Sequence, residues 1–93
     1  MNHEQCIWKY ELDIVNAQTV EMPPDSTILS VQEQNGVLVM WVMCIMAGCA
    51  KVHRNINIVG TGHSIRIPPG KYIGTVQRDG LVWHIFDCGE TKT

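Results

Sequence analysis

Asn35-Gly36 lies between residues 28–34, which begin with apolar side chains, and residues 37–44, which are all apolar. An Asn-Gly pair in this position is the strongest short-range signal for a β-hairpin, because both central residues of the turn need a positive φ. In the second run the side chains are apolar at odd and even positions alike. That pattern predicts a central strand that is covered on both faces or lies within a closed barrel. The chain is therefore expected to fold around an antiparallel strand pair.

Asp79-Gly80 provides a second hairpin signal, between residues 72–77 and 81–86. Residues 7–14 alternate between apolar and charged side chains, which is typical of a strand with one solvated face. No segment carries a capped helical period. We expect an all-β fold, a small antiparallel sandwich or barrel of six to seven strands with two tight hairpins. The other predicted strands are 18–22 and 53–59, with a brief pairing over 64–67.

The 93 residues are expected to form one β domain, because so short a chain cannot divide its apolar residues between two cores. Residues 1–6 and 89–93 are predicted to be frayed tails, and 45–50 a loop. The most apolar stretch, 37–49, is too short to span a bilayer, and the N-terminus lacks the apolar core of a signal peptide. These features predict a cytoplasmic protein without membrane contact.

The seven basic residues are dispersed among nine acidic ones, which gives a formal net charge of −2. Nucleic-acid affinity depends on clustered Lys and Arg side chains that neutralise phosphates. We therefore expect no direct sequence-specific contact with nucleic acid.

A glycine-rich segment is the most suggestive candidate for ligand binding. Two glycines allow a close backbone approach, and successive N–H groups could form an anion-binding nest beside His63 and an arginine. The simpler interpretation is a turn between strands in which His63 bonds a backbone carbonyl. The segment also lacks the ending of a P-loop. The candidate ligand-binding residues are Arg54, Gly60, Thr61, Gly62, His63 and Arg66.

Cys44 and Cys49, with His53 nearby, provide part of a zinc-ligand set. Structural zinc sites usually carry two tight ligand pairs, so reduced thiols are the simpler interpretation. His84 alternates with apolar neighbours and fits a hydrogen-bonded strand residue. No nucleophile turn or carboxylate pair is evident either. We expect no metal, no cofactor and no enzymatic activity.

The tryptophans divide into two groups. Trp8 and Trp41 each lie within an apolar face, which predicts core positions. Trp83 alternates with His84, so one face of their strand is predicted to be exposed. Core packing is the simpler interpretation of Trp83; the alternative is an interaction surface or dimer interface formed with Tyr72.

One set of segments along the chain carries a family resemblance: Trp8-Lys9-Tyr10, Glu21-Met22-Pro23, residues 28–37, Gly60-Thr61-Gly62-His63, residues 72–77, His84 and Phe86. Taken in this order, they resemble a family of small uncharacterised phage and prophage proteins of about this length. The resemblance implies a phage accessory protein and supplies no known reaction or catalytic residues. The apolar residues 44–50 depart from the polar loop that the family usually has there.

Three functions are consistent with this resemblance. The first is a non-enzymatic protein that binds and inhibits a host protein, of the anti-defence or host-takeover type. The second is an oligomeric sponge for a small nucleotide signal of antiviral defence. Its pocket would lie between subunits, because a β domain this small has little interior to spare. The third is a structural phage component. All three place the protein in the cytoplasm of an infected bacterial host.

Overall fold

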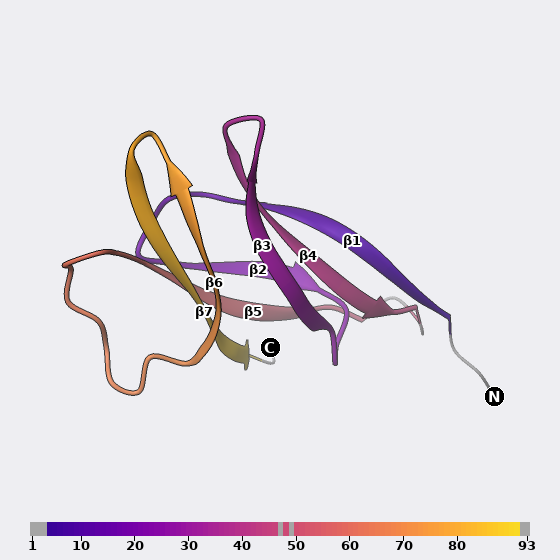
Figure 1. Cartoon of the computed structure of the whole chain (residues 1–93). Helices are drawn as coiled ribbons and strands as arrows, with labels where there is room; N and C mark the ends of the chain where they lie inside the picture. The colour runs from indigo at the N-terminus through magenta and orange to yellow at the C-terminus, as the bar shows by residue number, and fades with distance from the viewer. Residues whose placement is uncertain (1–3, 47, 49, 92–93) are drawn as a thin grey trace.

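The computed structural model describes residues 4–46, 48 and 50–91, which form seven strands and no helix (Figure 1). The all-β prediction is thus confirmed. The strands are β1 (Gln5–Leu12), β2 (Ala17–Met22), β3 (Thr27–Gln34), β4 (Val37–Ile45), β5 (Val52–Gly60), β6 (Lys71–Arg78) and β7 (Leu81–Thr91).

The strands form two antiparallel sheets that pack face to face as a small sandwich. Sheet A has the order β1-β4-β3, and sheet B has the order β2-β5-β7-β6. Strand β4 is central in sheet A, as its apolar sequence predicts. In sheet B, β7 lies between β5 and β6, and β2 pairs with the other side of β5. Sheet B therefore combines segments from both halves of the sequence.

Both predicted hairpins are present. Gln34 pairs with Val37 across Asn35-Gly36, whose φ values are 53° and 81°. The β6–β7 hairpin turns in the same way through Asp79-Gly80, with φ values of 54° and 77°. Positive φ at both central residues defines a type I′ turn, which matches the right-handed twist of the flanking strands.

The core lies between the sheets and takes alternate residues from each central strand. Strand β4 contributes four fully buried side chains, and β5 and β7 meet them from sheet B. Fully buried side chains of this size each contribute about 1.5–3 kcal/mol of hydrophobic stabilisation. The innermost residues include Met22, Leu38, Met40, Val42, Cys44, Ile56, Ile58 and Ile85.

One side of the sandwich is closed where β3 lies against β6. Each of these edge strands carries a β-bulge, at Leu29 in β3 and at Ile73 in β6. Gly74 makes the approach possible, since a Cβ built there would lie 2.9 Å from Cγ2 of Val31. The missing side chain therefore brings the two sheets together along this seam.

The ends of several strands differ from the predictions. Strand β1 begins at Gln5 and β7 continues to Thr91, so residues 5–6 and 90–91 are paired rather than frayed, and Gly89 lies in a bulge of β7. Residues 1–3 and 92–93 lie outside the described residues. Ile45 belongs to β4 and not to a loop. Residues 64–67 form no strand, because the chain there crosses the outer face of sheet B as a loop.

Two tryptophans lie outside the core that the sequence predicts for them. Trp8 shares the inner face of sheet A with Val42 but remains 49% exposed, because it lies near the start of the edge strand β1. Trp41 is only partly buried, and it points to the outer face of sheet A. The alternation predicted for residues 7–14 places Trp8 on the inner face, but neither tryptophan is covered as a core residue would be.

The described residues include no apolar helix of membrane-spanning length.

Candidate functional site

The outer face of sheet A carries an apolar patch that we call the β4 face. Residues paired across an antiparallel ladder point to the same side of the sheet. Because Leu38, Met40 and Val42 point inward, the intervening residues of β4 point outward, and Ile7 of β1 lies opposite Met43. The β4 face consists of Val39, Trp41, Met43 and Ile45 of β4 with Ile7 of β1.

Exposure within the β4 face increases toward the edge strand. Val39 is buried, Trp41, Met43 and Ile45 are half-buried, and Ile7 alone of these five residues is exposed, at 61%. Single exposed apolar residues are normal on a protein surface, but a contiguous patch is typical of an interaction site. The patch therefore marks the outer face of sheet A as a candidate binding surface.

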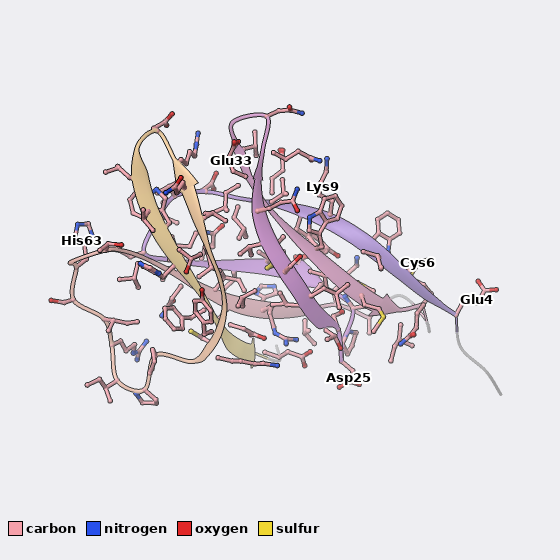
Figure 2. All side chains as sticks on the ribbon, in the orientation of Figure 1. Glu4, Cys6, Lys9, Asp25, Glu33 and His63 are labelled. Atoms are coloured by element: carbon pink, nitrogen blue, oxygen red, sulfur yellow. The ribbon has the colours of Figure 1, made fainter. Side chains whose placement is uncertain are left out.

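Polar side chains of the two flanking strands border the β4 face. Lys9 of β1 lies 5.9 Å from the centroid of the Trp41 ring, in a cation–π arrangement. Its Nζ also donates a 3.0 Å hydrogen bond to Oε1 of Gln34 (Figure 2 labels Lys9). Ser30 and Gln32 of β3 lie opposite Trp41 and Val39. An apolar centre with a polar border is the usual composition of a protein–protein interface.

Sequence reasoning did not identify this face, because it assigned both faces of residues 37–44 to the interior. A usable signal lay in the neighbouring strands. Lys9 and Glu11 in β1 alternate with Trp8, Tyr10 and Leu12, and Ser30 and Gln32 in β3 flank Val31. That alternation marks one face of the sheet as solvated.

The predicted ligand-binding segment forms a turn at the end of β5 (Figure 2 labels His63). His63 N–H donates to the carbonyl of Gly60 at 3.1 Å, and Gly62 has a φ of 88° while Thr61 does not have a positive φ. This combination defines a type II turn. Thr61 N–H donates to Val82 at 3.2 Å. Two N–H groups of the proposed nest, those of Thr61 and His63, are thus already bonded within the protein.

The side chains of this turn do border a shallow pocket with β7. His63 and Thr61 line it together with His84 and Phe86. Thr61 Oγ1 lies 2.8 Å from Nε2 of His84, whose Nδ1 lies 3.0 Å from Oγ1 of Thr75. His84 is therefore a hydrogen-bonded strand residue, as the sequence indicated.

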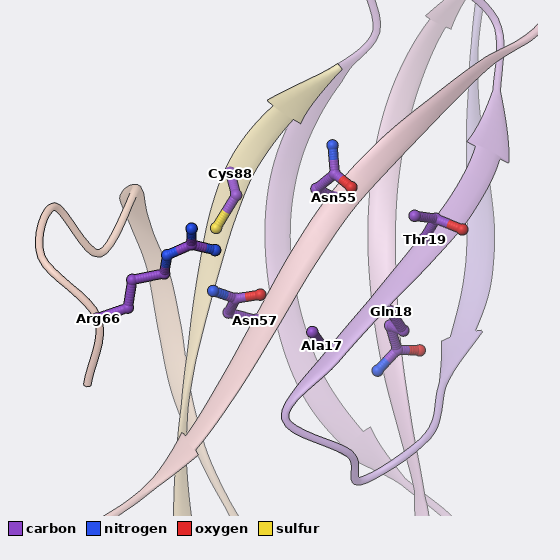
Figure 3. A pocket seen from close by; sticks show the side chains of 7 residues that line it. All are labelled: Ala17, Gln18, Thr19, Asn55, Asn57, Arg66 and Cys88. Carbon is purple, nitrogen blue, oxygen red and sulfur yellow. The ribbon is translucent and has the colours of Figure 1, made fainter. Parts of the chain in front are cut away.

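Arg66 reaches the same side of sheet B from the loop that follows the turn. It borders one pocket together with His63, and a second with Asn55, Asn57 and Cys88. In Figure 3 the Arg66 side chain extends from the loop toward Cys88 and Asn57. The structure thus brings His63 and Arg66 to one surface.

Arg54 does not join them, which corrects the predicted grouping. It lies on the inner face of sheet B, where Nε and Nη2 donate to the Asp87 carboxylate at 2.8 and 2.7 Å. Nη1 donates to the Ser26 carbonyl at 3.0 Å and to Glu90 Oε1 at 3.3 Å. The guanidinium group connects β5 and β7 of sheet B to the residue before β3 of sheet A.

This ion pair shifts both partners toward their charged forms. Burial by itself raises the pKa of Asp87, but the hydrogen bonds from Arg54 and Gly89, with the charges of Arg54 and Lys71, lower it below its usual value. The hydrogen bond to Asp87 is the main reason that the pKa of Arg54 is raised, against the opposing effect of burial. In this structure the Arg54 guanidinium group is held within an ion-pair network, away from the glycine turn.

The two predicted surface aromatics separate. Trp83 points inward beside Val76 and packs against the core, with its ring 3.1 Å from a Cβ built at Gly60. Tyr72 points outward, is 55% exposed, and meets Phe86 edge-on at 5.8 Å between ring centroids. Tyr72 therefore lies on a surface and Trp83 does not.

The suggested zinc ligands are not brought together. Cys44 is buried on the inner face of sheet A, whereas His53 points outward from sheet B, 3.7 Å from Glu21. Cys49 lies outside the described residues. In residues 4–46, 48 and 50–91, no three His, Cys, Asp or Glu side chains are grouped to hold a metal ion. Cys44 has a different neighbour, Tyr10 of β1. Burial and the nearby Cys44 thiol raise the pKa of Tyr10.

Two antiparallel sheets with one solvated apolar face define the chain as a small all-β domain. It belongs to the family described as a domain of unknown function, DUF7352, whose model matches residues 3–92. No curated protein and no solved structure matches the chain.

Proposed function

We propose that the protein is a non-enzymatic phage accessory protein that binds a host protein and inhibits it. The observation that carries this proposal is the β4 face, an apolar patch on the solvated side of sheet A. The family match leaves the source of the chain open, so the phage origin rests on the sequence resemblance and is part of the proposal.

The composition of the β4 face suits a protein partner. Trp41 provides a large side chain of low conformational entropy, and such residues dominate binding energy at interfaces. Met43 is flexible and polarisable, so it adapts to an irregular partner surface. The amide and hydroxyl groups along β3 would accept hydrogen bonds at the border. A host surface with a protruding apolar side chain surrounded by neutral polar groups fits this arrangement.

The test compares two lysine substitutions of the same chemical kind. Met43→Lys places a charge in the β4 face, whereas Ile67→Lys changes a side chain that is 90% exposed on the loop over sheet B. We expect the wild type and Ile67→Lys to capture and inhibit the same host protein, and Met43→Lys to lose both effects while keeping the wild-type circular dichroism spectrum. Equal capture and inhibition by folded Met43→Lys would contradict the proposal.

A second candidate, the nucleotide sponge, is favoured by one observation: His63 and Arg66 border the same pocket. A cationic side chain beside an imidazole suits a phosphate group. Native mass spectrometry of protein purified gently from infected cells would show a nucleotide-sized adduct that is lost on denaturation. The adduct should be absent from Arg66→Ala. A wild-type mass without any adduct would contradict this candidate, and copurification with phage particles would favour a structural role.

A further inference from the structure

We infer that the protein forms a symmetric dimer in which β1 pairs antiparallel with β1 of a second copy. The dimer would join two copies of sheet A into one continuous six-stranded sheet. This inference goes beyond the proposed function and does not depend on it, since it concerns the edge of sheet A and not the partner of its outer face.

The first argument is that β1 is the least protected of the four edge strands. An unpaired strand edge is a template for another strand, and proteins usually block it with bulges, prolines, short strands or covering elements. Strands β3 and β6 are bulged and lie against each other, and β2 has six residues and is followed by Pro23-Pro24. In the described part of the chain, β1 pairs over eight residues without a bulge, and only with β4 (Figure 1).

The second argument is the exposure of large apolar side chains along β1. Ile7 and Trp8 point to opposite faces of the strand, and both are well exposed. A neighbouring strand would shield side chains on both faces at once, which a partner on one face alone would not achieve. This double exposure indicates an occupant that adds to the edge.

The third argument identifies the occupant as a second copy. When the two-fold axis is perpendicular to the sheet and passes beside Tyr10, Lys9 of each copy lies directly opposite Glu11 of the other. Both residues point to the outer face, so two opposite-charge pairs form at cross-strand distance when Lys9 Nζ exchanges Gln34 Oε1 for the Glu11 carboxylate of the second copy. Centring the axis on Lys9 or Glu11 would instead place like charges opposite each other. The charge order of β1 is therefore self-complementary about Tyr10.

The charge order provides a test by sedimentation equilibrium. Lys9→Glu and Glu11→Lys each place like charges in both cross-strand pairs, so each variant alone should be monomeric at concentrations where the wild type is dimeric. An equimolar mixture of the two should form a heterodimer. The double variant Lys9→Glu/Glu11→Lys should dimerise again. Recovery in the mixture separates a charge-matched interface from simple misfolding.

The register has an independent test by disulfide trapping. In a Cys6→Ser/Cys49→Ser/Cys88→Ser background, which keeps only the buried Cys44, Tyr10→Cys places two thiols opposite each other, at a Cα separation that suits a disulfide. Mild oxidation should then give covalent dimers. Trp8→Cys is the control, because residue 8 faces Leu12 of the second copy and should not crosslink. A monomeric wild type, or single charge variants that dimerise as the wild type does, would overturn the inference whatever the host-protein assays show.

Discussion

Arg54 is the residue on which the two sheets depend most directly. Its guanidinium group donates to Asp87, Glu90 and the Ser26 carbonyl, and Glu90 in turn accepts the backbone N–H of Asp25 at 2.9 Å. A planar group with donors on several sides can make all these bonds at once, which lysine cannot. The network therefore fixes the turn before β3 onto the end of β7.

Replacing Arg54 should be strongly destabilising. Arg54→Ala leaves the largely buried Asp87 carboxylate without its partner, and breaking a buried ion pair on one side typically costs about 3–5 kcal/mol. We expect urea denaturation to show a loss of free energy of unfolding near the lower end of that range. Arg78→Ala, which removes the partner of the exposed Asp79, should change stability by less than about 1 kcal/mol. Equal losses would show that the Arg54 pair contributes nothing special.

The same pair predicts the response to acid. Because the pKa of Asp87 is lowered in the folded state, the carboxylate stabilises the fold fully above its unfolded pKa, which is about 3.9, and that contribution is lost as pH falls through the folded pKa. Urea titrations from neutral pH downward should show stability falling below about pH 4 in the wild type. Asp87→Asn should be less stable at neutral pH and show a shallower acid dependence. Parallel curves would contradict this linkage.

The ion pairs of Arg54 could not be predicted from the sequence. The turn at residues 60–63, which was predicted as part of the same site, could be predicted. Gly60, Thr61 and Gly62 form a turn for local reasons, since Gly62 supplies the positive φ that the turn needs. Successive side chains of a strand point to opposite faces, so the face that Arg54 occupies depends on which residues of β5 are inward. Its partner depends on the register of β5 with β7, which lie more than thirty residues apart along the chain. Contacts of that range leave no mark on local patterns.

At the level of strands, the hairpins follow from turn chemistry alone and the strand ends do not. Asn35-Gly36 and Asp79-Gly80 adopt the φ values that their residue types favour. In contrast, β7 runs past Phe86 through Gly89, where a bulge opposite Asn55 absorbs the extra residue. Asn55 Nδ2 donates to the Gly89 carbonyl at 3.1 Å and supports that bulge. Pairing with β5 thus extends β7 to Thr91, beyond the end at residue 86 that its own sequence predicts.

The β3–β4 turn should be sensitive to a side chain for conformational reasons only. A Cβ at Gly36 would meet no atom within 4 Å, but φ there is 81°. Gly36→Ala should therefore lower the free energy of unfolding by about 1 kcal/mol, the usual cost of the left-handed region for a residue with a Cβ. Gly36→Asn should cost less, because asparagine tolerates this region better. Thermal denaturation of both variants measures the difference, and an equal cost for both would contradict a backbone origin.

At the level of the whole molecule, the choice between sandwich and barrel depends on which strands meet. Both architectures use the same alternation of residues, so the sequence pattern left them open. The seam between β3 and β6 joins segments that no hairpin connects, and it requires the absence of a side chain at Gly74. A glycine inside a strand pattern signals a close approach but does not name the partner.

Adding a side chain at the seam should push the sheets apart. Gly74→Ala places a methyl group 2.9 Å from Val31 Cγ2, and overpacking of this kind typically costs about 1–3 kcal/mol. Val31→Ala should reduce that cost, so the double variant should be more stable than the sum of the two single losses implies. A double-mutant cycle by urea denaturation measures this coupling. Strict additivity would show that the two residues do not compete for space.

The position of β7 also determines when the molecule can assemble during its synthesis. Sheet B places the strand made last, Leu81–Thr91, between β5 and β6, which are made earlier. Until Thr91 has left the ribosome, β5 and β6 have no strand to join them, although β1 can pair with the β3–β4 hairpin and β2 can pair with β5. Sheet B therefore stays divided into the β2–β5 pair and an unpaired β6 until β7 has been made.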